Sequence, residues 1–532
     1  MNKEKLLKAI GDIDPAFVRE AEPGSRKRSA LSWALPAAAA CVLTLGLALV
    51  LPRVLGEAAP GEASPGEKSA AISTESIDAV PAAGPSAGSG ESGYGDIKGN
   101  VPSASSTEAP DASEPVRGVW TPDKADPALV TGFLVSEAED MTLDVKNAGD
   151  RALIRDARDK TPQLKGFASK LVSELISENP TSNTVLSPVN LYAALAMVAE
   201  TSEGETRAEI LKLLEADSME QLRGNVRDLI TGQSRNDDHV RCTFADSLWM
   251  NNAYGFNTET LENLSKYHGA SVFWGDPAEE SYTLALREWL NEQTGGLLSD
   301  YADDIELDEN MLLTLVSTLY FRCSWNDKYN ADDTAQRVFH APCGDIACDF
   351  MSKLPVNLSI HMGENFTALG DRLNEGAGTA WFLLPDEGVS IEEMLAQGGM
   401  DFMLSEKPRA DWETDFITSS TILTIPKLDI SSRNDIIPAL KKLGVNACFD
   451  PEKADFSPLT DEKDVFVNKI EHSARICADE DGVEAAAYTL VQYYGGPHEP
   501  QSEYVLDRPF VLMIEGSAGA PLFIGVVNTP NN

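Results

Sequence analysis

Basic side chains are scarce in this chain. Its 532 residues include 43 Lys and Arg against 84 Asp and Glu, which gives a formal net charge of −41. Because nucleic acids and anionic lipid surfaces attract basic protein surfaces, this balance argues against both as partners. The acidity indicates good solubility.

Sequence signatures of metal binding and catalysis are also missing. The six His are scattered, and neither C-x-x-C nor H-E-x-x-H occurs, so we expect no metal site. No nucleophile, base and orienting group share a recognisable pattern, so we expect neither enzymatic activity nor a cofactor. The seven Cys are too few for a dense disulfide framework, although Cys343 and Cys348 bracket a Gly-Asp turn and could close a short disulfide.

Charge is absent between Arg28 and Arg53. Residues 29–52 are mostly apolar, and a helix of this length, rising about 1.5 Å per residue, crosses a hydrocarbon core of about 30 Å. Basic residues precede this segment, so we expect an uncleaved transmembrane anchor with residues 1–28 in the cytoplasm. A cleaved secretory signal is the alternative, and both interpretations place the remaining chain outside the cell.

The next two segments differ in composition. Residues 53–126 are rich in Ala, Gly, Ser, Pro and Glu, with few aromatic residues and no hydrophobic period, so we expect a disordered linker that acts as a tether. Residues 127–160 are an unassigned extension, which we expect to pack on the following domain as an extra strand and helix. That domain is expected to span residues 161–532.

The stretch from Glu480 to Val491 suits both an exposed loop and a buried strand. Read at period two, one face is small and uncharged: Val483, Ala485, Ala487, Thr489 and Val491. Residues 493–500 contain two Gly and two Pro, which cannot continue a regular element and indicate an accessible tip. Taken alone, the Ala-rich run is also consistent with the start of a surface helix.

This pattern resembles the reactive-centre loop of the serpins, a family of serine protease inhibitors. The family's hinge consists of an acidic residue, any residue, Gly, any residue, Glu and three small residues. In this chain it is matched by Glu480, Gly482, Val483, Glu484, Ala485, Ala486 and Ala487. Further matches occur in the family's order at residues 183–204, 289–296, 315–325, 453–457, 467–472, 507–510 and 522–528. The resemblance covers roughly residues 164–528.

The resemblance implies an α+β serpin fold with three β-sheets, about eight or nine helices and an exposed reactive-centre loop. A single transmembrane helix and a disordered tether would precede this fold. An anchor followed by a tether, without a eukaryotic sorting signature, favours a membrane-anchored bacterial type displayed at the cell surface. We expect a monomer.

The family resemblance implies a suicide-substrate mechanism. A protease attacks the loop, and the cleaved stem inserts into the large sheet and traps the covalent acyl-enzyme. Val483 departs from the usual Thr or Ser at the first inserting position, but it is uncharged, and Gly482 supplies backbone freedom for the bend. The alternatives are a non-inhibitory serpin-like surface binding protein whose loop is only a substrate, and a surface adhesin.

The family opens its sheet at a polar cluster, whose matching positions are Ser187, Asn190, Ser317 and His472. Where the family commonly has Ser and then Asn, this chain has Asn190 and then Ser317. Our hypothesis is that these two residues exchange roles, with the longer amide reaching His472. Otherwise His472 is a satisfied core histidine. Trp325 matches the Trp that covers the site where the stem first inserts, and it could also be plain core.

The scissile bond follows from the family's spacing. About seventeen residues from Glu480 the count reaches Gly496, but Pro497 comes next and most serine proteases do not cut before proline. We therefore predict Tyr494–Gly495, since an aromatic side chain suits a deep apolar specificity pocket, with His498–Glu499 as the alternative. The target would be a chymotrypsin-like or subtilisin-like serine protease, or else a papain-like cysteine protease.

Overall fold

The structure, a computed structural model, describes residues 127–138, 140–143, 148–178, 180–353, 356–404, 416–483 and 502–531. The predicted cytoplasmic tail, anchor and linker lie outside these residues. Within the described part, no helix combines the length and the apolar character needed to cross a membrane.

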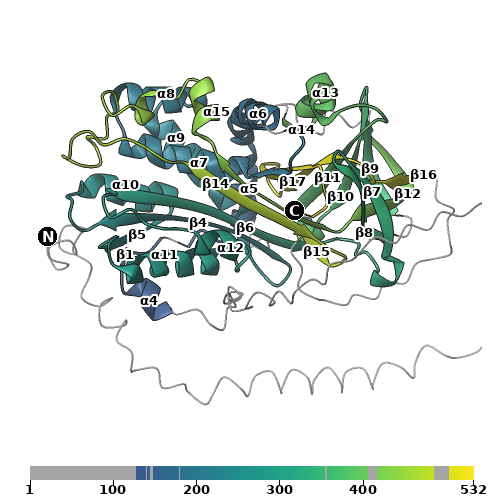
Figure 1. Cartoon of the computed structure of the whole chain (residues 1–532), viewed down its shortest axis with the longest axis horizontal. Helices are drawn as coiled ribbons and strands as arrows, with labels where there is room; N and C mark the ends of the chain where they lie inside the picture. Colours follow the sequence, from purple (N-terminus) through teal and green to yellow (C-terminus); the bar gives the residue numbers. More distant parts are fainter. Residues whose placement is uncertain are drawn as a thin grey trace, which may run out of the picture. The chain divides into compact units, whose positions relative to one another are not determined.

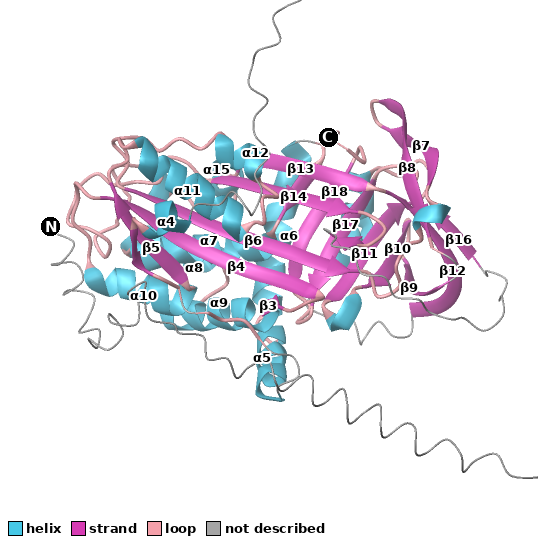
Figure 2. Cartoon of the chain, turned by 90° about the horizontal axis from the view of Figure 1, so that it is seen from below, coloured by secondary structure: helices cyan, strands magenta, loops and turns pink. Residues whose placement is uncertain are grey.

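An eight-stranded sheet forms the centre of the described part. Its path runs β1 (Leu134–Ser136), β5 (Ala270–Gly275), β4 (Val240–Asn251), β6 (Leu313–Ser324), β15 (Gly482–Val483), β14 (Glu471–Ala478) and β13 (Leu428–Asp435), and β3 (Arg235–Asn236) pairs with β4. All neighbouring strands are antiparallel except β4 and β5. Figure 2 shows β4, β6, β14 and β13 side by side as long strands.

Helices cover both faces of this sheet (Figure 1). Leu248 and Met250 of β4 pack in one apolar cluster with Met197 of α7 (Pro188–Thr201), on one face. On the other face Trp249 contacts Trp289 of α11 (Glu280–Gln293), with ring centroids 6.4 Å apart. This alternation along β4 is the period-two pattern of a strand that is buried on both sides.

The other described helices have between four and eighteen residues. They are α4 (Pro127–Thr131), α5 (Ala148–Arg158), α6 (Thr161–Glu178), α8 (Gly204–Leu213), α9 (Met219–Gln233), α10 (Thr258–His268), α12 (Ser299–Asp303), α13 (Ile391–Met394), α14 (Met400–Leu404) and α15 (Ile437–Lys442). Short helical turns also occur at Ala331–Asp333, Asn374–Gly376, Leu395–Gly399 and Ala447–Phe449. The described part therefore has more helices than the eight or nine expected, because α12, α13 and α14 have only four or five residues each.

The remaining strands form one ten-stranded sheet. Its path runs β2 (Thr184–Leu186), β18 (Pro521–Val527), β17 (Phe510–Gly516), β11 (Gly378–Pro385), β10 (Phe366–Arg372), β9 (Val356–Met362), β12 (Phe416–Pro426), β8 (Gly344–Ser352) and β7 (Ala335–Ala341), and β16 (Ser502–Val505) lies parallel to β12. The first half of β12 pairs with β9 and its end pairs with β8. Two of the three expected sheets are thus continuous through β12.

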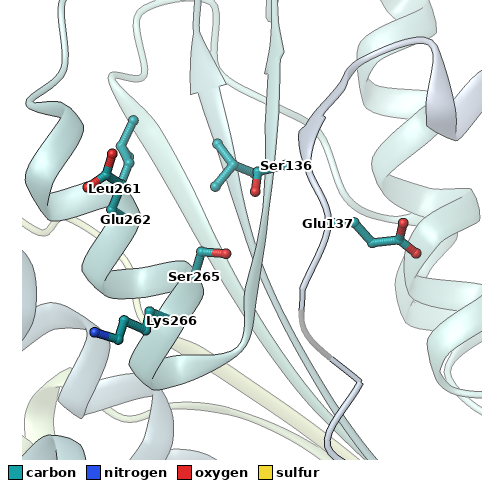
Figure 3. A pocket seen from close by; sticks show the side chains of 7 residues that line it. Ser136, Glu137, Leu261, Glu262, Ser265 and Lys266 are labelled. Carbon is teal, nitrogen blue, oxygen red and sulfur yellow. The ribbon is translucent and has the colours of Figure 1, made fainter. Parts of the chain in front are cut away.

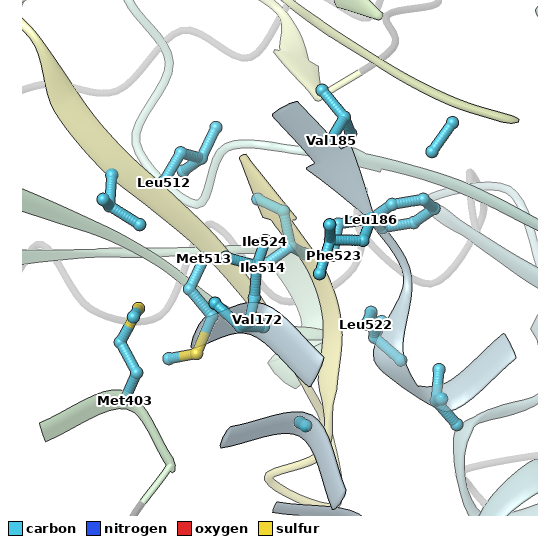
Figure 4. Packing of buried hydrophobic residues seen from close by; sticks show 14 of the residues in the cluster. Val172, Val185, Leu186, Met403, Leu512, Met513, Ile514, Leu522, Phe523 and Ile524 are labelled. Carbon is cyan, nitrogen blue, oxygen red and sulfur yellow. The ribbon is translucent and has the colours of Figure 1, made fainter. Parts of the chain in front are cut away.

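The main hydrophobic core lies between this second sheet and the helices on it. In Figure 4, Val172 of α6 and Met403 of α14 approach Met513, Ile514 and Ile524 of β17 and β18. These side chains belong to a large cluster of buried apolar residues. Burial of apolar area on this scale is the dominant favourable term in folding.

The start of α7 has the predicted cap. Ser187 is extended, with φ −110° and ψ 101°, its hydroxyl accepts a hydrogen bond from the Asn190 backbone N–H, and Pro188 opens the helix. Both residues satisfy the special requirements of a helix N-terminus. The Ser-Pro pair therefore fixes the start of α7, and Asn190 is buried in its first turn.

The extension before residue 161 packs on the domain. β1 pairs with β5 at the edge of the central sheet, and the Phe133 ring lies 5.0 Å from that of Tyr282 in α11. Helix α5 contacts α9 so closely that a Cβ on Gly232 would lie 2.1 Å from the Ala157 Cβ. The extension supplies a strand and two helices, α4 and α5.

Candidate functional site

The centre of the candidate site is the short strand β15, which lies between β6 and β14 (Figure 1). Gly482 pairs with Ser324 and Val483 with Cys323 on β6, while Val483 pairs with Ala478 on β14. Among the described strands, β6 and β14 are hydrogen-bonded to β15 and not to each other. β15 is thus the one described strand between β6 and β14, and both of its residues are paired.

Gly482 is required by close contact. A Cβ at this position would lie 2.3 Å from the Cys323 carbonyl oxygen and 2.7 Å from the Ser324 Cα. Both are backbone atoms of β6, which cannot move aside cheaply. Glycine is therefore needed here because the chain approaches β6 so closely. From the sequence we expected a different reason, the freedom of the backbone to bend.

Trp325 and Tyr329 hold the chain just before β15. The Trp325 indole Nε1–H donates to the Asp479 carbonyl at 2.8 Å, and the Trp325 backbone N–H donates to the Asp481 carbonyl at 3.2 Å. The Tyr329 backbone N–H donates to the Glu480 carbonyl at 3.2 Å. Trp325 is almost fully buried. The aromatic residue matched to the insertion site therefore contacts the hinge directly.

The Glu480 side chain forms a clamp with a hydroxyl and an ammonium group. Its Oε1 accepts a hydrogen bond from Thr334 Oγ1 at 2.6 Å and lies 2.9 Å from Lys427 Nζ. Partial burial would raise the pKa of Glu480, but the hydrogen bonds from Thr334 and Lys427 outweigh burial and lower it. The next residue, Asp481, pairs with Lys328 at 2.7 Å. Two lysines thus fix the hinge.

We predict that Glu480→Gln loosens this clamp. The loss should be at most about 1 kcal/mol of unfolding free energy, because Lys427 is partly exposed. A carboxyl whose folded pKa is depressed stabilises the fold above its unfolded pKa, and this contribution disappears as the pH falls through the folded pKa. Thermal unfolding should therefore separate Glu480→Gln from wild type at pH 7, and the difference should shrink as the pH falls below the usual pKa of Glu. The exposed Glu503 of β16 provides the control, Glu503→Gln, and equal melting of both variants at pH 7 would rule out the clamp.

A buried ion pair lies behind Trp325 and Tyr329. Lys353 Nζ is 2.5 Å from Asp371 Oδ2, and both residues are less than 5% exposed. The same ammonium group lies 5.1 Å from the Trp325 ring centroid and 4.4 Å from that of Tyr329. Burial lowers the pKa of Lys353 and raises that of Asp371. One cation therefore contacts both aromatic residues that hold the hinge.

The residues expected to form a polar cluster at the sheet opening lie at the start of α7 and on β6 and β14. His472 Nε2 on β14 accepts a hydrogen bond of 3.0 Å from the Ser187 backbone N–H, and burial lowers the pKa of His472 to about 4. The ring is therefore neutral at neutral pH. Asn190 lies on α7 and Ser317 on β6. The exchange of roles between Asn190 and Ser317 stays a prediction.

Three buried ionisable residues of this region carried no signal in the sequence. They are Asp246, Lys353 and Asp371. Asp246 pairs in register with Ser317, and Lys353 and Asp371 come from separate segments. Conservation among aligned relatives could mark these three positions, whereas a single sequence shows only isolated charges among apolar residues.

Other predicted site residues lie outside the described residues. These are Glu484, Ala485, Ala486, Ala487, Tyr494 and Gly495. Cys343 and Cys348 are both free thiols, so the disulfide considered between them is absent from the structure. Within the described ranges, no group of three or more His, Cys, Asp or Glu is placed to hold a metal ion.

A pocket of about 360 Å³ lies at the far edge of the sheet. Figure 3 shows it between β1 and α10, with Ser136, Glu262, Ser265 and Lys266 among its lining residues. Strands β4 and β6 separate this edge from β15. The pocket is therefore not part of the candidate site.

Comparisons with known proteins agree on one family. The sequence model described as "Serpin (serine protease inhibitor)" matches residues 162–530. The rat protein "Alpha-1-antiproteinase" is 28% identical over 380 residues, which cover 69% of this chain and 88% of the relative. Among solved structures, the thermophilic serpin tengpin in its native state has a TM-score of 0.61 at 23% identity, covering 74% of this chain and 97% of that one. A complex of thyroxine-binding globulin with thyroxine has a TM-score of 0.61 at 23% identity, covering 70% of this chain and 99% of that one. At these identities the solved structures establish the fold.

Proposed function

The chain belongs to the serpin family and is not an enzyme, and from this premise we propose that it is a suicide-substrate inhibitor of an extracellular serine protease. The protease serine attacks the scissile carbonyl in the reactive-centre loop, an acyl-enzyme forms, and the new amino terminus leaves. The stem then inserts between β6 and β14 and carries the acylated protease with it before water can release the acyl group.

The position of β15 carries this proposal. Its antiparallel register pairs Gly482 with Ser324 on β6 and Val483 with Ala478 on β14. If the cleaved loop continued in this register, residues 485 and 487 would lie opposite residues 321 and 319. Thr489 would lie between Ser317 and His472. The small, uncharged face of the stem would then enter the core, as strand addition requires.

The finer features stay proposals. We propose Tyr494–Gly495 as the scissile bond and a chymotrypsin-like or subtilisin-like serine protease as the target. We also propose that residues 29–52 anchor a monomeric, extracellular inhibitor to a bacterial membrane. A binding role is the second candidate, since one neighbour in fold was solved with thyroxine bound.

Incubation with a panel of serine proteases tests the proposal. Denaturing electrophoresis should show a stable adduct with the target, and mass measurement should find a C-terminal fragment beginning at Gly495. Clean cleavage with full protease activity retained would instead make the loop a substrate only. A fragment that begins elsewhere would move the scissile bond without affecting the mechanism.

A further inference from the structure

The turn between β14 and β15 is held by a closed set of hydrogen bonds. Within it, the Asp479 backbone N–H donates to the Gly482 carbonyl at 3.0 Å, and Asp479 Oδ1 accepts hydrogen bonds from the Asp481 and Gly482 backbone N–H groups at 2.9 and 3.3 Å. The other three carbonyls of the turn all accept hydrogen bonds from Trp325 and Tyr329. The start of the new strand is therefore formed in the intact chain, and its geometry depends on two aromatic residues.

One cation contacts both of these rings. Lys353 Nζ lies 5.1 Å from the Trp325 ring centroid and 4.4 Å from that of Tyr329, and the two rings meet edge to face with their centroids 5.6 Å apart. Asp371 completes the arrangement, since its Oδ2 accepts hydrogen bonds from the Lys353 ammonium group and, at 3.3 Å, from the Tyr329 hydroxyl. Each of the four side chains thus contacts at least two of the others.

A buried ion pair is a costly way to fill this space. Lys353 is 3% exposed and Asp371 is 4% exposed, so both charges have lost their hydration. Two apolar side chains of similar size would avoid this desolvation cost, and stability alone therefore does not account for the pair. A cation against two ring faces does give both rings a preferred orientation, which an apolar pair cannot do. The pair is therefore explained by the geometry of the turn.

We propose that Lys353 is a positioning residue for strand uptake, because its ammonium group, oriented by Asp371, holds Trp325 and Tyr329 where they keep the turn before β15 formed. Lys353 acts through the two rings. A turn that is already formed spares the cleaved stem the entropy of closing a new hairpin, so the stem inserts before the acyl-enzyme is hydrolysed. This inference rests on the proposed inhibitory function, since uptake follows cleavage of the reactive loop.

Two measurements on the full chain test this inference. Lys353→Met combined with Asp371→Leu removes the cation, and we expect the backbone amides that hold the turn to exchange hydrogen about tenfold faster. The number of inhibitor molecules consumed per protease molecule trapped should rise by a similar factor. Lys353→Arg keeps a cation against both rings and should preserve the wild-type values. Glu200→Leu combined with Arg223→Met is the matched control, since it removes an ion pair between α7 and α9, and it should change neither measurement.

The outcomes separate this inference from the proposed function. Unchanged exchange in the turn, or an equal change in the Glu200 and Arg223 control, would overturn the role of Lys353. Faster exchange with an unchanged adduct yield would overturn its role in uptake. Faster exchange in a chain whose wild type forms no protease adduct would support the positioning of the turn and overturn the inhibitory function. If the first double variant does not fold, Lys353→Gln combined with Asp371→Asn, which keeps a hydrogen-bonded pair without charge, decides in its place.

Discussion

Val483→Arg is expected to turn the inhibitor into a plain substrate. Val483 is 4% exposed and lies between Cys323 and Ala478 of the two flanking strands. An unpaired guanidinium buried there costs several kcal/mol, so the variant should keep residue 483 out of the sheet in the intact protein, and the cleaved stem must then start its insertion without the pairs of β15. Every 1.4 kcal/mol or so slows a step about tenfold. Insertion should therefore become slower than hydrolysis of the acyl-enzyme, by a factor of about a hundred or more.

The measurement is the number of inhibitor molecules consumed per protease molecule trapped. We expect Val483→Arg to be cleaved at the same bond while the stable adduct disappears. Val483→Thr is the matched control, since it preserves the β-branched shape without a charge, and it should still form the adduct. An unchanged adduct yield in Val483→Arg would mean that insertion does not need the pairs that Val483 forms in β15.

Lys353→Ala is expected to be the most destabilising single change near the hinge. It leaves the Asp371 carboxylate buried without its cation and removes the ammonium group from the faces of Trp325 and Tyr329. Breaking a buried pair from one side costs about 3–5 kcal/mol. Chemical unfolding at pH 7 should show this loss. It should shrink at low pH, because burial raises the pKa of Asp371 and protonation then removes the uncompensated charge.

The matched control replaces both partners. Lys353→Met combined with Asp371→Leu removes the two charges together and should be close to neutral or stabilising, since an apolar pair avoids the desolvation cost. If Lys353→Ala cost less than about 1 kcal/mol, the pair would contribute little to holding Trp325 and Tyr329. A double variant as unstable as Lys353→Ala would show that shape matters more than charge here.

Local signals predicted the parts of the site that depend on neighbouring residues. Ser187 and Pro188 mark the start of α7, because a cap and a proline act on the first turn alone. The family pattern also identified Gly482 and Trp325, which meet at the hinge although their positions lie far apart in the chain. The close contact of Gly482 with Cys323 could not be predicted, because it depends on β6 lying alongside.

The residues that were missed depend on long-range packing. Asp246 and Ser317 are 71 positions apart in the sequence and become neighbours only when β4 pairs with β6. Lys353 and Asp371 are residue types that usually lie on the surface, and only the fold shows that they are buried together. Sequence spacing also did not determine whether Cys343 and Cys348 form a disulfide, and both are free. In the same way it did not predict the short helices α12 to α14.

The melting temperature of the loop-cleaved protein, compared with that of the intact protein, tests the central claim most directly. Completing a strand between β6 and β14 would release stored free energy, and a gain of about 5–10 kcal/mol corresponds to roughly 6–13 °C for a domain of about 370 residues, at an unfolding entropy of about 2.1 cal/mol/K per residue. We predict a rise in that range after cleavage at Tyr494–Gly495. Equal melting temperatures for the two forms would contradict a metastable sheet and with it the inhibitory mechanism.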